Sequence, residues 1–276
     1  MAWYIERGRT DEHAAKRIMN TVESWAKEYV LSTDLAVKLA PPPVPRAWDD
    51  PKDPCRIEAP GRPGALTITG RAPKSPGQGA LREPARRAEL MHTFLHHELQ
   101  AAELMAWALL AFPDTPRAFR QGLLGVLADE VRHMALYRDY LAALGFSFGD
   151  FPVRDWFWER VPVCPTATHF AALMGIGFEG GNLDHTQRFA ARLRAAGDER
   201  GAAIEEQVGQ EEIPHVRFAL TWFRRWTQAD TFAAWTSYLV PPLTPTVMRG
   251  SPINREARRE SGMTDSFIDD LAAWSA

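Results

Sequence analysis

Four long helical segments place the strongest constraint on what this sequence can fold into. Residues 85–112 contain no Gly or Pro and are rich in Ala, Leu, Glu and His, and Pro113–Pro116 ends that run. The expected long helices cover residues 85–112, 116–144, Thr166 or Thr168 to about Ala196, and 199–227. Their connections are short, long and short, which is typical of an antiparallel four-helix bundle with one long crossover. We therefore predict an all-α fold.

The segment before the bundle differs from it in composition. Residues 41–84 hold 11 of the 21 prolines of the chain, which excludes a continuous helix there. The apolar run Ala65–Thr69 favours an arm that lies strand-like against the body over a free linker. A helix capped by Thr10 is expected before this arm, up to about Val30.

The chain after the bundle is expected to form short helices. They cover residues 230–239, 254–261 and 264–274. We thus expect three parts: an N-terminal helix and Pro-rich arm (1–84), the bundle (85–240) and a C-terminal helical extension (241–276). The aromatic crossover from Phe146 to Pro165 is long enough for one short helix.

Composition excludes several classes of protein. The 276 residues include 32 Lys and Arg against 35 Asp and Glu, so the net charge of −3 gives no global signature of nucleic-acid binding. Two cysteines form neither a disulfide framework nor a metal-ligand spacing, and no apolar run is long enough to span a membrane. We expect a cytoplasmic protein with no membrane contact.

Two Glu-x-x-His motifs carry the chemistry. Glu130–His133 and Glu212–His215 each place a carboxylate and an imidazole on one helix face, where both can bind the same metal. The motif alone is weak, because Glu89–His92 is a third copy.

Matching glutamates on the preceding helices strengthen the signal. Glu98 stands 32 positions before Glu130, and both are 14 residues from the intervening turn, so an antiparallel hairpin brings them level. Glu179 stands 33 positions before Glu212, a difference that a bulge at Gly180–Gly181 or an early helix end would absorb. Glu103, five residues later, is a competitor of Glu98 for the role of metal ligand on this helix.

Together these side chains predict a di-metal carboxylate centre. The predicted ligands are Glu98, Glu130, His133, Glu179, Glu212 and His215. Four carboxylates balance two divalent cations, whereas without metal four buried acids would repel one another. Glutamate and imidazole ligands suit Fe or Mn better than Zn.

Several neighbouring residues have two interpretations. Asp129 and Glu211 either form salt bridges or accept hydrogen bonds from the ligand imidazoles. Tyr137, four residues after His133, is a candidate catalytic residue or a core tyrosine. His92, His96, His97 and Glu89 are expected on the helix surface or behind the ligands.

Helical glycines have three interpretations, and the grouped arginines have two. Gly175, Gly177, Gly180 and Gly181 indicate close packing, a π-bulge or a channel to the metal. Pro214 predicts a local kink. The arginines form two groups, which are ordinary surface residues or a patch for a phosphate-bearing partner such as RNA: Arg82, Arg86 and Arg87, and Arg249, Arg255, Arg258 and Arg259.

The motif segments resemble the ferritin-like superfamily. The segments that carry this resemblance are His96–Glu103, Asp129–His133, Phe178–Asn182, Glu211–His215 and Pro252–Gly262. They are most similar to an uncharacterised bacterial ferritin-like family, and more distantly to the tRNA-hydroxylase type. The resemblance implies two Fe ions (or Fe/Mn) that react with O2, without fixing a substrate.

The expected function is that of an O2-activating hydroxylase or monooxygenase. Its organic substrate and electron donor are unknown, and we expect a monomer or small homo-oligomer. Three alternatives stay open: a ferroxidase or iron-buffering protein, an RNA-directed hydroxylase, and a metal-free helical scaffold. Nucleic-acid binding is possible in principle, although the net charge does not favour it.

Overall fold

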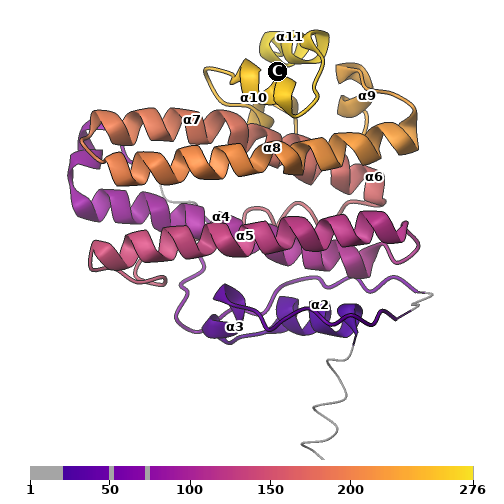
Figure 1. Cartoon of the computed structure of the whole chain (residues 1–276), viewed down its shortest axis with the longest axis horizontal. Helices are drawn as coiled ribbons and strands as arrows, with labels where there is room; N and C mark the ends of the chain where they lie inside the picture. The colour runs from indigo at the N-terminus through magenta and orange to yellow at the C-terminus, as the bar shows by residue number, and fades with distance from the viewer. Residues whose placement is uncertain (1–20, 50–52, 72–74, 276) are drawn as a thin grey trace, which may run out of the picture.

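Four parallel and antiparallel rods form the centre of the molecule (Figure 1). The computed structural model describes residues 21–49, 53–71 and 75–275. The rods are α4 (Pro84–Ala111), α5 (Arg117–Ala143), a composite of α6 (Ala167–Phe170), η2 (Ala171–Glu179) and α7 (Gly180–Ala195), and α8 (Glu199–Thr227). The hairpins α4–α5 and α7–α8 pack most extensively. The prediction of an all-α bundle is confirmed.

Local signals fix most of the helix ends. Pro84 occupies the first turn of α4, where its missing N–H is not needed. The side chains of Thr166 and Asp198 accept hydrogen bonds from the backbone of His169 and Gly201, and so cap α6 and α8. Thr115 does not cap α5. Its hydroxyl donates instead to the Phe112 carbonyl that the end of α4 leaves free, and α5 begins after Pro116.

The third rod contains a π-helical stretch, η2, immediately before α7. A π-helix adds residues per turn and thus shifts all later side chains around the helix axis. It ends at Glu179, just before Gly180 and Gly181, where a bulge was expected, and these two glycines lie in the regular α-helix α7. The 33 positions from Glu179 to Glu212 therefore lie after the π-helical stretch. Helix α8, by contrast, continues through Pro214.

Glycine lets this rod pack closely against its neighbours. A Cβ atom at Gly175 would lie 2.3 Å from the Ala219 Cβ on α8, and one at Gly177 would lie 2.7 Å from the Met248 sulfur. Both distances are shorter than van der Waals contact. Close packing and a π-helix, two of the three interpretations of these glycines, therefore hold together.

The N-terminal segments lie on the α4–α5 side of the bundle. Helix α2 (Val22–Leu31) is capped by Thr21, and with α3 (Leu35–Leu39) it lies below the α4–α5 pair in Figure 1. The expected cap Thr10 lies outside the described residues. The arm that follows docks through backbone contacts, including Thr69 N to Val153 O (2.8 Å). The run 65–69 forms only an isolated bridge, Ile68 to Val153, and not a strand.

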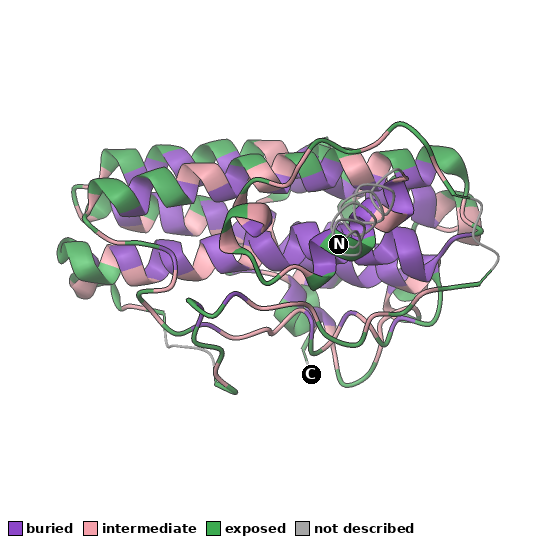
Figure 2. Cartoon of the chain, turned by 90° about the horizontal axis from the view of Figure 1, so that it is seen from below, coloured by how far each residue is buried: buried purple, intermediate pink, exposed green. Residues whose placement is uncertain are grey.

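The C-terminal elements cover the face formed by α7 and α8 (Figure 1). They are α9 (Phe232–Thr236), η3 (Pro245–Met248), α10 (Arg255–Glu260) and α11 (Asp265–Ala273). Within the described residues, the crossover between α5 and α6 consists of turns and contains no helix. Buried positions line the helix faces that point between the rods (Figure 2). Across the described ranges, no helix is both long and apolar enough for a membrane span. The three-part division at residues 84 and 240 stays a prediction.

Candidate metal centre

The six predicted ligands meet inside the bundle and are all buried. They fall into two groups of four, and within each group one ligand atom per residue lies within 4.8 Å of the others. The first group is Glu98, Glu130, His133 and Glu212, and the second is Glu130, Glu179, Glu212 and His215. Glu130 and Glu212 belong to both groups. A buried cluster of this kind can hold a metal ion.

The two shared glutamates lie between the two imidazoles. Glu130 Oε2 is 3.4 Å from His133 Nδ1, and Glu130 Oε1 is 3.3 Å from His215 Nδ1. Glu212 repeats this arrangement, at 3.8 Å from His133 Nδ1 and 3.0 Å from His215 Nδ1. Each half then adds one glutamate of its own, Glu98 or Glu179. The cluster thus has two similar halves that share Glu130 and Glu212.

The residues that precede the motif glutamates contact the imidazole nitrogens that face away from the cluster. Glu211 Oε2 lies 3.0 Å from His133 Nε2, and Asp129 Oδ2 lies 3.0 Å from His215 Nε2. Each acid therefore binds the histidine of the other motif. Such a bond fixes the ring orientation and leaves Nδ1 facing the cluster.

Arg132 joins these two acids. Its guanidinium donates to Asp129 and, at 2.7 Å, to Glu211 Oε2. Both interpretations of the acids therefore hold, because each forms a salt bridge and also contacts a ligand imidazole. Arg132 was not among the predicted site residues, although it lies inside the first motif.

The cluster holds four buried carboxylates and two buried imidazoles, and these groups shift one another's pKa. Burial raises the pKa of Glu98 and of Glu179 well above the usual value, with neighbouring glutamates adding to the shift. Burial alone would lower the pKa of His133, but Glu130 and Glu98 outweigh it and raise that pKa to about 12. Without a cation, the imidazoles therefore keep protons to balance the carboxylates.

Unpartnered buried atoms support a fit between this cluster and metal ions. Both Glu130 oxygens, Glu179 Oε1 and His133 Nδ1 have no hydrogen-bond partner among the described residues. Such atoms are costly to bury unless another group satisfies them. Carboxylate and imidazole donors suit Fe or Mn, so the donor set fits two such ions.

Glu103, the competitor of Glu98, has a structural role instead. Its carboxylate binds Lys38 at 2.6 Å and Arg62 at 2.7 Å, and it accepts a hydrogen bond from the Trp158 indole. Glu103 thereby ties α3, the arm and the crossover to α4. The sequence offered no signal for this pairing, because Lys38 and Arg62 are far from Glu103 along the chain.

The other candidates are placed around the cluster. Tyr137 is buried and donates a hydrogen bond to Glu205 Oε1 at 3.0 Å, a buried partner that the sequence analysis missed. His92 accepts from the Gly149 amide, and His96 bonds Asp155, so neither binds the cluster. Glu89 pairs with Arg86.

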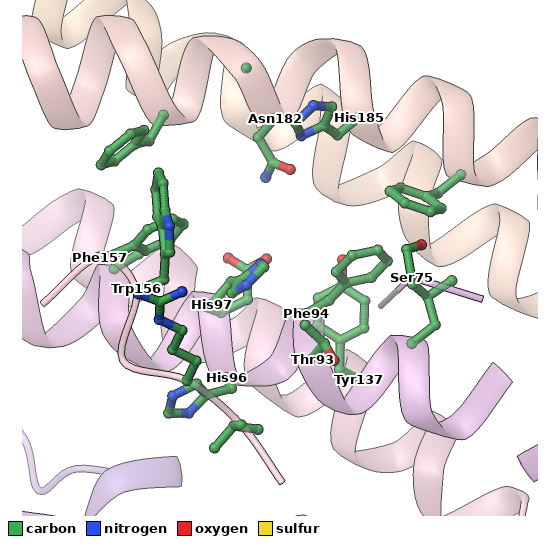
Figure 3. Close-up of a pocket in the computed structure, with 18 of the residues that line it drawn as sticks. Ser75, Thr93, Phe94, His96, His97, Tyr137, Trp156, Phe157, Asn182 and His185 are labelled. Carbon is green, nitrogen blue, oxygen red and sulfur yellow. The ribbon is translucent and has the colours of Figure 1, made fainter. Parts of the chain in front are cut away.

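A cavity of about 380 Å³ adjoins the cluster, within the size range of small-molecule sites. Its wall includes the terminal ligands Glu98 and Glu179. In Figure 3, His97 on α4 lies across the cavity from Asn182 and His185 on α7, while Trp156 and Phe157 of the crossover line one end. A small molecule in this cavity would therefore lie directly beside the candidate metal positions.

The C-terminal arginines bind partners within the chain. Arg258 is buried against Asp184 at 2.7 Å, and Arg249 donates to carbonyls at the end of α11. Arg255 and Arg259 pair with Asp269 and Asp265. These contacts favour a structural role for this group over an RNA-binding patch.

Comparison with known proteins places the chain in a family. The model of a protein family of unknown function, DUF455, matches residues 10–269. The chain belongs to this family. An uncharacterized protein of Haemophilus influenzae is similar to the chain, with 25% identity over 211 residues and 72% of each chain covered. No solved structure matches it. The DUF455 match spans all six clustered residues, and it assigns them no role.

Proposed function

We propose that this DUF455 protein is a ferritin-like, non-haem di-iron (or Fe/Mn) oxidoreductase that uses O2 to hydroxylate an organic substrate. The observation that carries the proposal is the sharing of Glu130 and Glu212 by two four-donor groups. One ion site alone would not need two glutamates with each oxygen directed to a different imidazole.

The chain supplies binding, orientation and a dry environment for this reaction. When bound, the metal pair would supply the redox chemistry for R–H + O2 + 2 e⁻ + 2 H⁺ → R–OH + H2O, with both electrons from an external donor. Asp129 and Glu211 hold the imidazoles in place, and the apolar bundle core excludes water. The cavity positions a substrate beside Glu98 and Glu179.

The cavity favours this function over the two metal-based alternatives. An iron-buffering protein needs no chamber of about 380 Å³ lined by aromatic rings next to its metal site. An RNA-directed hydroxylase needs exposed cations at the cavity mouth, whereas the C-terminal arginines already bind acids and carbonyls of the chain.

Oxygen uptake tests the proposal. Protein loaded anaerobically with two equivalents of Fe(II) is expected to consume O2 on mixing with air-saturated buffer. The double variant Glu130→Ala/His215→Ala is expected to bind less than about half the iron, because it removes donors from both positions. Glu206→Ala, an exposed glutamate on α8, is the control. Wild-type iron content in a folded double variant would refute the site.

A further inference from the structure

One end of the cavity combines aromatic rings with a buried carboxylate. Phe94, Tyr137 and Phe189 line it, and the Phe94 ring centroid lies 4.9 Å from that of Phe189 and 6.0 Å from that of Tyr137. The carboxylate is Glu205, which is 1% exposed and also lines the cavity. The four residues come from α4, α5, α7 and α8, so every rod of the bundle contributes one.

Glu205 lacks a cationic partner. Its contact among the described residues is the Tyr137 hydroxyl, and none of the described lysines and arginines forms an ion pair with it. Burial raises the pKa of Glu205 to about 8, and the Tyr137 hydroxyl offsets that only in part. Burial thus favours the neutral acid at pH 7, and an ammonium ion brought in by a ligand would favour the carboxylate form.

The other acids and the arginine of the cavity wall each pair with an opposite charge or belong to the candidate metal cluster, unlike Glu205. Glu89 pairs with Arg86, Arg154 pairs with Glu159, and Glu98 and Glu179 belong to the metal cluster. Arg188 and Arg192 stack on Phe189, but neither lines the cavity. A wall with aromatic faces and one uncompensated carboxylate is complementary to an ammonium ion.

We infer that Phe94, Tyr137, Phe189 and Glu205 bind the ammonium group of an amine with an apolar body. That this amine is the substrate rests on the proposed function; its binding does not. Tyr137 lies seven residues after Glu130 on α5, and Glu205 lies seven residues before Glu212 on α8. Both are displaced from the shared glutamates toward the same end of the bundle. Seven residues correspond to about 10 Å, so the apolar body of the amine would reach the metal positions.

Calorimetric titration with matched probes tests this inference. Phenylbutylamine, phenylbutanol and phenylpentanoate share one hydrocarbon body and differ in the charge of the end group. We expect the amine to bind about tenfold more tightly than the alcohol, and the carboxylate to bind most weakly. Equal affinity for amine and carboxylate would overturn the inference.

Variants locate the binding. Glu205→Gln is expected to lower the amine affinity about tenfold and to leave the alcohol within about twofold, because only the charge interaction is lost. Glu206→Gln changes the adjacent exposed residue and should alter neither affinity. If Glu205→Gln fails to fold, Phe189→Leu, which removes one aromatic face, should weaken the amine selectively. Unchanged amine affinity in the folded variant refutes the assignment.

The same titration separates this inference from the proposed function. Amine binding by chelator-treated protein, without O2 uptake in the iron-loaded form, would support the ammonium site and contradict the oxidase. Oxygen uptake by protein that binds no amine would do the reverse.

Discussion

At the residue scale, the centre depends on acids that contact the metal positions only through histidine. Asp129 and Glu211 each bind one imidazole, and Arg132 holds both acids. The six inner residues could be predicted because their spacing follows from helix geometry. Glu205 and the pairing of each acid with the opposite histidine could not, because they depend on how α5 and α8 cross.

The double variant Asp129→Asn/Glu211→Gln tests the contacts that these two acids make with the imidazoles. The amides keep the shape of the acids but hold the imidazoles less firmly, so we expect metal affinity to fall by about 10- to 100-fold. Competition with a chromophoric chelator measures the change. Asp139→Asn, at an exposed position on α5, serves as the control and should retain wild-type affinity. Unaltered affinity in the double variant would show that the outer contacts are dispensable.

At the element scale, helix boundaries followed from local signals, while the glycines gave the π-helix only as one of three interpretations. The predicted starts at residue 85, at Thr166 or Thr168 and at residue 199 lie at or next to the first residues of α4, α6 and α8. Gly175 and Gly177 of η2 approach Ala219 of α8 and Met248 closely, and sequence periodicity does not encode these contacts. The glycines marked the right region, but they could not separate packing from a channel.

Two glycine substitutions distinguish close packing from helix propensity. Gly175→Ala puts a methyl group against Ala219 and is expected to lower the free energy of unfolding by about 1–3 kcal/mol. Gly125→Ala, inside α5 with open space around it, should raise that free energy by up to about 1 kcal/mol. Urea denaturation measures both. A neutral or stabilising Gly175→Ala would contradict the close approach of η2 and α8.

At the scale of the whole molecule, buried charges hold the N-terminal segments on the bundle. Glu103 joins Lys38, Arg62 and Trp158, and Arg62 continues to Asp155 in the crossover. The docked arm could be anticipated from its apolar run, but its anchors could not. These anchors join three segments, and the order of the segments along the chain does not indicate which charged residues pair.

Glu103→Gln tests this anchor. It leaves Lys38 without its carboxylate in a fully buried position, so we expect a loss of about 3–5 kcal/mol in the free energy of unfolding. Limited proteolysis should then cleave the arm between residues 53 and 71 more rapidly. Glu58→Gln, at an exposed position of the same arm, should change neither quantity. Wild-type protection of the arm in Glu103→Gln would show that other contacts suffice.

The most direct test of the metal centre is anomalous diffraction at the iron absorption edge from crystals of iron-loaded protein. The proposed centre should give two peaks in the bundle, one at Nδ1 of His133 and one at Nδ1 of His215, with Glu130 and Glu212 between them. A single peak, or density outside this cluster, would contradict it.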